Sequence, residues 1–170
     1  MARQAASPER RSGQVTAKTA GSGRARTPDA PLLPWSHRFG PLGRTVVTVL
    51  AAAGVAFVGT LAHRMGAMVN IPYGLAIAFA VTALSTYAAR ARQGVTGLAV
   101  HLIVSSAVAW AFALYGGPGG DALVVAGFSE PEPFFSEHAG YIWLYGVIVV
   151  QVAMLVLPAS WFRIPAPKTR

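Results

Sequence analysis

Among the polar side chains within otherwise apolar runs of the sequence, five are candidates for a functional role. They are Thr82, His101, Ser105, Ser106 and Gln151. His101 titrates near neutral pH, and Ser105 lies one helical turn further on, on the same face. An imidazole beside a hydroxyl could relay a proton or activate a nucleophile, but either role needs an acidic partner. All six carboxylates lie outside the apolar runs, so we expect hydrogen-bonded packing here rather than a catalytic pair.

The stretch GGPGGD at residues 116–121 resembles a phosphate-binding loop only in its glycine content. No strand pattern precedes it, and no lysine followed by serine or threonine completes it. Glycines that allow a positive φ, with a proline that blocks further helix, instead suit the exit of a helix. We therefore expect Gly117, Gly119, Gly120 and Asp121 to form a structural turn, followed by a short strand or extended hairpin in DALVVAGF.

Asp121 opens an acidic loop that could bind a cation or pair with a basic residue. The loop acids are Asp121, Glu130, Glu132 and Glu137, and the nearby histidines are His63 and His138. Such a set could coordinate a metal ion or serve an enzyme at this face. The EPEP spacing holds two acids on an extended strip, so we favour a solvated loop without metal or cofactor. We expect Asp121 to pair with Arg64, and an Asp121→Ala change to weaken packing through that pair.

The elements that position these residues follow from the composition. The chain has 170 residues, of which 54% are hydrophobic and 12% charged, with a mean hydropathy of +0.48. This is too apolar for an ordinary soluble domain, and it indicates a membrane protein. The net charge of +8 could suggest nucleic acid, but the basic residues are concentrated outside the apolar runs. The chain has no cysteine, which excludes disulfides and thiolate chemistry.

Four apolar runs predict an all-α membrane protein, a bundle of four transmembrane helices over residues 45–162. The predicted spans are 45–62, 73–89, 97–115 and 141–157. Each is close to the roughly 20 residues that cross a bilayer, and none contains a charged residue. We expect a disordered basic tail over 1–34, an interfacial segment over 35–44, an extended outer loop between the third and fourth helices, and a basic tail over 163–170.

The basic residues predict the orientation of the bundle. With both termini in the cytoplasm, 13 of the 14 Lys and Arg residues lie inside, and only Arg64 lies outside. We therefore expect a multi-pass protein of the cytoplasmic membrane with both tails cytoplasmic. Aromatic residues agree, because Tyr73, Tyr115 and Tyr141 fall at the outer boundary and Trp161 at the inner one.

Polar residues inside the spans should face one another, because hydrocarbon makes an unpartnered polar group costly. Counting from the outer ends places Thr82, Ser105 and Gln151 roughly 15 Å deep, near the midplane. Gly54 is expected to permit close approach there. A deeper layer is expected to hold His101, Tyr87 and Thr48. The small pairs Ala76–Ala80 and Ala107–Ala111 are expected to permit close packing of a compact bundle.

Several short motifs resemble a family of uncharacterised small four-span integral membrane proteins common in high-GC Gram-positive (actinobacterial) bacteria. In some genomes they lie beside the deacetylase of mycothiol biosynthesis. The motifs are HR (His63 and Arg64), PYGL (72–75), RAR (90–92), GPGGD (117–121) and GYIWLYG (140–146). The resemblance covers about residues 40–160 and implies a four-span fold without an established activity, cofactor or functional residue. This chain has a longer outer loop, SEPEPFFSEHA, and a longer basic tail.

These patterns predict a non-enzymatic accessory or structural membrane subunit. The alternative is a small transporter or channel component whose path is lined by the midplane side chains. A membrane enzyme acting through the outer histidines and acids is the least favoured reading. We expect the lipid bilayer and either another membrane protein or a second copy of the chain as partners, and no nucleic acid.

Overall fold

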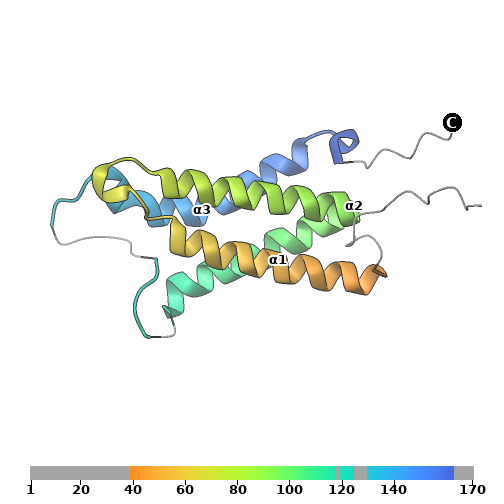
Figure 1. Ribbon diagram of the computed structural model, residues 1–170, viewed down its shortest axis with the longest axis horizontal. Helices are drawn as coiled ribbons and strands as arrows, with labels where there is room; N and C mark the ends of the chain where they lie inside the picture. The colour runs from red at the N-terminus through yellow and green to blue at the C-terminus, as the bar shows by residue number, and fades with distance from the viewer. Residues whose placement is uncertain (1–38, 118, 125–129, 163–170) are drawn as a thin grey trace, which may run out of the picture. The chain divides into compact units, whose positions relative to one another are not determined.

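The computed structural model describes residues 39–117, 119–124 and 130–162, and this part of the chain is built from helices and turns (Figure 1). The elements in chain order are α1 (Pro41–Ala62), η2 (Ala67–Val69), α2 (Tyr73–Tyr115), α3 (Phe134–Val156) and η3 (Ala159–Phe162). No strand occurs among the described residues. The predicted tails over 1–34 and 163–170 lie outside them.

Helix α1 begins at Pro41, within the segment predicted to be interfacial. Proline suits the first turn because its missing N–H has no partner there, and Gly40 precedes it in an extended conformation. The helix ends at Ala62, where the His63 N–H donates to the carbonyl of Gly59. The predicted C-terminal boundary of this span is therefore correct, and the helix begins four residues before its predicted start.

A tight connection joins α1 to α2. Gly66 (φ 79°) and Asn70 (φ 57°) adopt the left-handed conformation on either side of η2, and the Ile71 N–H donates to the Gly66 carbonyl. The Asn70 Oδ1 does not cap α2 but accepts from the Phe135 N–H, 3.3 Å away, at the start of α3. This side chain therefore satisfies an N-terminal donor of a different helix.

Helix α2 reverses direction at Gly94. Its φ of 63° and ψ of −143° are not helical, and they interrupt an otherwise continuous run of 43 residues. Ser85 Oγ and His101 Nε2 lie 2.8 Å apart across this point, whereas the same 16 residues in a straight helix would span about 24 Å. The two halves, 73–93 and 95–115, are therefore antiparallel neighbours, as Figure 1 shows on either side of the α2 label.

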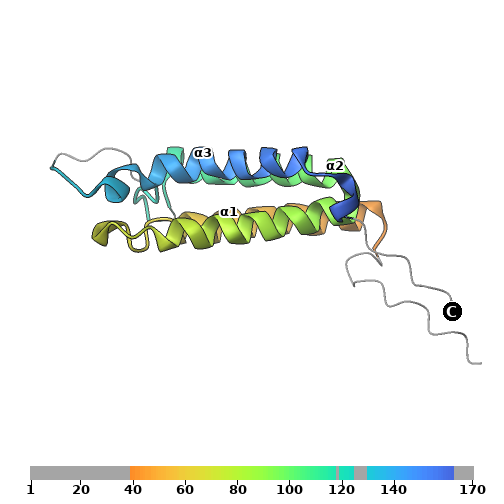
Figure 2. The same cartoon turned by 90° about the horizontal axis from the view of Figure 1, so that it is seen from above.

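The described helices pack in two layers. Figure 2 shows α1 beside the first half of α2 in one layer, and α3 beside the second half in the other. Small or polar buried residues recur every four positions along the facing stripes. In α1 they are Thr48, Ala52, Ala56 and Thr60; in α2 they are Gly74, Ala78, Thr82 and Thr86, then Gly97, His101, Ser105 and Ala109. Such stripes let helix backbones approach closely.

The small residues predicted to lie between closely packed helices are not the ones that do so. Ala76, Ala80 and Ala107 are exposed rather than buried between helices. Gly54 is also exposed, and a Cβ built there would meet no atom within 4 Å. The sequence contains so many alanines and glycines that spacing alone does not distinguish the facing stripe from the outer one.

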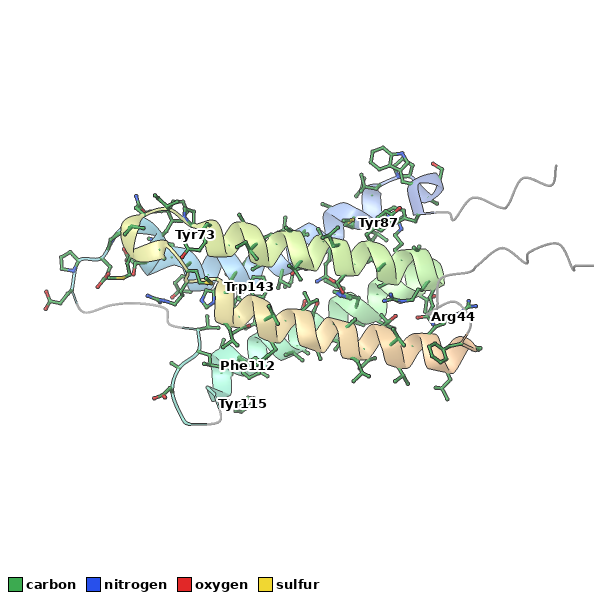
Figure 3. The ribbon with its side chains drawn as sticks, in the orientation of Figure 1. Arg44, Tyr73, Tyr87, Phe112, Tyr115 and Trp143 are labelled. Carbon is green, nitrogen blue, oxygen red and sulfur yellow. The ribbon has the colours of Figure 1, made fainter. Side chains whose placement is uncertain are left out.

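Trp143 of α3 occupies the centre of the packing near the Ala62 end of α1, and its side chain is fully buried (Figure 3). Its indole N–H donates to Thr60 Oγ1 at 3.1 Å, and its ring packs against Gly59, where a Cβ would overlap it. Phe79 contacts the same ring, with centroids 5.8 Å apart, and fills the space left by Gly146. Glycines therefore make room for the largest core side chain.

Helix α3 begins at Phe134, seven residues before the predicted start at Tyr141. Residues 134–139 were predicted to belong to the outer loop, but they form the first turns of the helix after Pro133. The strand predicted from Asp121 is not present over 121–124, where only residues 123 and 124 form a bend, and the rest of that prediction lies outside the described residues.

The described helices have an apolar exterior and a small, polar interior. Leu42, Leu84, Ile103 and Val156 are each at least 68% exposed, whereas His101, Ser105 and Gln151 are fully buried. All three long helices are apolar enough over enough residues to cross a bilayer. This distribution is compatible with a helical membrane protein, because lipid would solvate large apolar side chains and leave polar groups to bond with each other.

Candidate functional site

Four side chains from three helical segments form a connected group, here called the His101 network, in which three members are fully buried and Ser85 is half-buried. Ser85 lies in the first half of α2, His101 and Ser105 in the second half, and Gln151 in α3. Gln151 Oε1 is 2.7 Å from His101 Nδ1, and Gln151 Nε2 donates to Ser105 Oγ at 2.9 Å. Ser85 Oγ completes the chain at 2.8 Å from His101 Nε2.

The hydrogen bonds assign a tautomer to His101. Gln151 Nε2 also donates to the Val147 carbonyl at 2.9 Å, and a carbonyl can only accept, so the amide orientation is determined. Oε1 then faces His101 Nδ1 and must accept, which places the imidazole proton on Nδ1. Nε2 carries the lone pair that accepts from the Ser85 hydroxyl. A neutral imidazole therefore satisfies both its donor and its acceptor within the protein.

Two threonines flank this network. Thr86 Oγ1 donates to the Thr82 carbonyl at 2.8 Å and lies 3.3 Å from His101 Nδ1. Thr82 Oγ1 donates to the Ala78 carbonyl at 2.8 Å. Thr82, predicted in one layer with Ser105 and Gln151, is therefore buried but bonded within its own helix. Ser106 Oγ is buried without a hydrogen-bond partner among the described residues.

The structure joins Ser105 to Gln151, as the depth estimate predicts, and it adds Ser85, which that estimate did not select. His101 was placed one layer deeper, yet its side chain reaches Gln151 directly. A usable signal was present in the sequence, because Ser85 and His101 are equidistant from Gln93, beside the reversal. Thr48 and Tyr87, predicted to be level with His101, bond elsewhere.

At the Gly94 end of the helices, here called the reversal end, Gln93 joins α2 to the start of α1. Its Nε2 donates to Thr45 Oγ1 at 2.9 Å and to the Pro41 carbonyl at 3.4 Å. Its Oε1 accepts from Thr48 Oγ1, also at 3.4 Å. One amide side chain therefore ties the first turns of α1 to the reversal of α2.

Arg90 joins the same end to α3. Its guanidinium donates to the carbonyls of Met154 and Leu157, which have no partner within the helix because they lie at its C-terminus. The guanidinium carbon also lies 4.1 Å from the centroid of the Phe162 ring. Tyr87 OH donates to the Trp161 carbonyl at 2.8 Å. The end of α3 is therefore capped by side chains of α2.

The opposite end, where α1 ends and α3 begins, contains His63 and Arg64. Arg64 Nη2 donates to Ser136 Oγ at 3.3 Å, and the predicted ion pair with Asp121 is not present between these two described residues. His63 is buried, and its Nδ1 lies 2.5 Å from the Thr60 carbonyl, to which it donates. Burial, with a further contribution from the charge of Arg64, lowers the pKa of His63.

The glycine segment after α2 forms a turn. Gly116 (φ 75°) and Gly120 (φ 81°) take left-handed conformations, the Gly117 N–H donates to the Asp121 carbonyl at 2.8 Å, and the Gly120 N–H donates to the Gly117 carbonyl at 2.9 Å. Gly119 lies between them, and a Cβ added there would meet only Asp121 Oδ2, 3.5 Å away. The backbone geometry fits a helix exit, and Asp121 participates in the turn through its carbonyl.

The outer histidines do not converge. His138 is partly exposed, 3.9 Å from Glu137, and its Nδ1 donates to the Phe134 carbonyl at 2.9 Å. His63 is instead buried against Trp143. No group of three or more histidine or carboxylate ligands occurs in the part of the chain that the structure describes.

No protein-family model, curated protein or solved structure matches the chain. The class of protein is therefore defined by the helices themselves: the described part of the chain is all-helical, with three long apolar helices that are compatible with a membrane-embedded bundle.

Proposed function

We propose that the chain is a four-span protein of the cytoplasmic membrane with both termini in the cytoplasm. The reversal at Gly94 supports two crossings within α2, and the distribution of charge supports the orientation. Arg44, Arg90 and Arg92 belong to the reversal end. The described acids all lie in segment 119–137, at the other end. Figure 3 shows Tyr73 and Tyr115 at one end and Arg44 and Tyr87 toward the other, as two interfacial belts require.

Single cysteines test this topology cleanly because the chain has none of its own. Thr96, beside the reversal, and Glu130, before α3, are both exposed. A membrane-impermeant maleimide applied to intact cells is expected to label Glu130→Cys and to spare Thr96→Cys until the membrane is opened. Labelling of Thr96→Cys alone from outside would reverse the proposed orientation. Labelling of both would contradict the paired crossings of α2.

Within the membrane, the chain functions as a non-enzymatic accessory or structural subunit that packs against another protein. The observation that carries this proposal is the closure of the His101 network. His101, Ser105 and Gln151 are fully buried and bond with each other. Side chains that line a solute path need hydrogen-bonding capacity directed toward the path, whereas here the imidazole and amide are fully used within the protein.

A transporter or channel component remains the alternative, with Ser106 as its best support because its hydroxyl is buried and unpartnered among the described residues. From the resemblance described above we also propose that the chain belongs to that family of small four-span membrane proteins. This membership implies no activity. An outer-face enzyme has less support, because His63 and His138 lie in different environments and recruit no described third ligand.

Purification of the full-length tagged chain from native membranes, after in-cell cross-linking, tests the accessory role. We expect one membrane protein to co-purify at a constant ratio across several mild detergents. A matched preparation without cross-linker controls for capture after solubilisation. Recovery of the chain alone under all conditions, together with solute uptake in proteoliposomes that Gln151→Leu abolishes, would favour the transporter instead.

A further inference from the structure

Arg92 presents a guanidinium edge that no described residue uses. Its Nε and Nη2 are both buried and have no hydrogen-bond partner among the residues that the structure describes. These two nitrogens lie along the same side of the planar group, and their N–H bonds point in nearly parallel directions. Such an edge matches two oxygens of one phosphate or carboxylate group.

The neighbouring arginine shows what a satisfied guanidinium looks like in this bundle. Arg90 lies two residues earlier, donates to the carbonyls of Met154 and Leu157, and stacks on Phe162. Arg92 makes no comparable bond to a described residue, although it lies on the same helix and at the same end. Two residues rotate a helix by about 200°, so the two guanidiniums leave α2 on different sides.

Arg92 is half-buried as a residue, but the two nitrogens of this edge are buried. Leaving charged donors desolvated without an acceptor costs more than leaving neutral ones so. The described carboxylates cannot supply the anion, because Asp121, Glu130, Glu132 and Glu137 all belong to the opposite end. The ligand of this edge must therefore come from outside the described part of the chain.

We propose that Arg92 binds the phosphate of an anionic phospholipid headgroup at the reversal end of the bundle. The reversal at Gly94 lies where the chain turns back between two apolar crossings, which is the depth of the headgroup layer. Basic clefts between helices at such positions hold lipid phosphates. Only the position of this site in the headgroup layer rests on the proposed membrane topology. The unsatisfied edge itself is a property of the described helices.

The test uses purified full-length protein in an uncharged detergent, with unfolding followed by the fluorescence of its four tryptophans. Dioleoylphosphatidylglycerol is expected to raise the melting temperature in a saturable manner. Arg92→Gln is expected to weaken the apparent affinity about tenfold, because it removes two charge-assisted hydrogen bonds. Arg92→Lys is expected to weaken it by less, since the charge remains but the two-pronged edge is lost.

Arg44→Gln is the matched control, because it removes the same charge from the same end, and we expect its affinity to stay within about twofold of the wild type. Inorganic phosphate without lipid distinguishes the source. A saturable shift by phosphate alone that Arg92→Gln abolishes would identify a free anion as the ligand of the same edge, and a shift with lipid only identifies the headgroup.

Equal affinities of the wild type and Arg92→Gln would overturn the proposal, as would an Arg44→Gln variant weakened to the same degree as Arg92→Gln. If Arg92→Gln elutes as an aggregate, the comparison between the wild type and Arg92→Lys decides. Equal binding by these two proteins would then refute a role for the guanidinium edge. If the topology experiment fails but the lipid still raises the melting temperature in a manner that depends on Arg92, the phosphate site is retained. Only its position in the headgroup layer is then refuted.

Discussion

His101 and Gln151 lie 50 residues apart in the chain, and Nδ1 of the first is 2.7 Å from Oε1 of the second. This bond connects the second half of α2 to α3 in the fully buried interior. It also determines which imidazole nitrogen carries the proton. Both amide hydrogens of Gln151 are donated to Ser105 and Val147, so its Oε1 faces His101 and accepts. A pair of polar residues thereby specifies how two apolar helices are aligned.

Gln151→Leu is expected to destabilise the protein. It removes the nearer acceptor of the buried His101 Nδ1–H and leaves only Thr86 Oγ1, 3.3 Å away, at a cost of about 1 to 3 kcal/mol. Unfolding by sodium dodecyl sulfate in mixed micelles measures the change. Val149→Leu, at a position that is 64% exposed, serves as the control and should stay within about 0.5 kcal/mol of the wild type. A Gln151→Leu protein as stable as this control would argue against the network.

Gly59→Ala and Gly54→Ala are expected to differ sharply although they lie on one helix. A Cβ at Gly59 would overlap the ring of Trp143, while a Cβ at Gly54 meets nothing within 4 Å. We expect Gly59→Ala to cost about 1 to 3 kcal/mol through overpacking, and Gly54→Ala to be neutral or stabilising by up to about 1 kcal/mol. Melting temperatures in detergent compare the two, and similar values would contradict this packing of Trp143.

Gly94→Ala is expected to destabilise the reversal of α2 without any steric clash. A Cβ added at Gly94 would meet no atom within 4 Å, so the cost comes from the φ of 63° and ψ of −143°, which only glycine adopts readily. We expect a loss of about 1 to 3 kcal/mol, measured by unfolding in mixed micelles. Gly40→Ala is the control, because its φ of −62° suits any residue and its surroundings are also open. Equal stability of the two variants would contradict the strained reversal.

Stability is expected to fall as the pH drops below about 6.5, with His63 as one cause. Burial lowers the pKa of His63 in the folded protein, so the unfolded chain takes up a proton first. Above neutral pH, His63 therefore leaves the free energy of unfolding unchanged. This free energy falls progressively as the pH drops below the pKa of His63 in the unfolded chain, and it stays lowered by a constant amount below the pKa in the folded protein. Between about pH 8 and about pH 5, the melting temperature should decline less steeply for His63→Phe than for the wild type. Parallel curves would exclude His63.

Asp121→Ala is expected to be tolerated, within about 0.5 kcal/mol of the wild type. Asp121 is exposed, and its carbonyl, which accepts from Gly117, remains in the variant. This revises the expectation from sequence, in which Asp121 acted through Arg64. Ser136→Ala removes the hydroxyl that Arg64 contacts and is expected to lower the melting temperature more. A larger effect of Asp121→Ala would restore the original pairing.

Much of the helical architecture could be read from hydropathy alone. Helix α1 ends at Ala62 and α2 spans Tyr73–Tyr115, in agreement with the predicted outer boundaries. The start of α3 was missed by seven residues, because Phe134 and its neighbours look like loop when they are judged by acidity and by the preceding prolines. Helix caps depend on local backbone geometry, which composition does not determine.

The candidate site was only partly predictable. From hydropathy alone, His101, Ser105 and Gln151 lie in apolar runs, and in hydrocarbon such side chains would have to find partners within the protein. Which partner each side chain takes depends on the rotation and offset of the helices, and these were decided by the tertiary packing of Trp143 on Gly59 and by the reversal at Gly94. Hydropathy is summed over a whole span and is insensitive to rotation, whereas a hydrogen bond depends on angstrom-scale alignment.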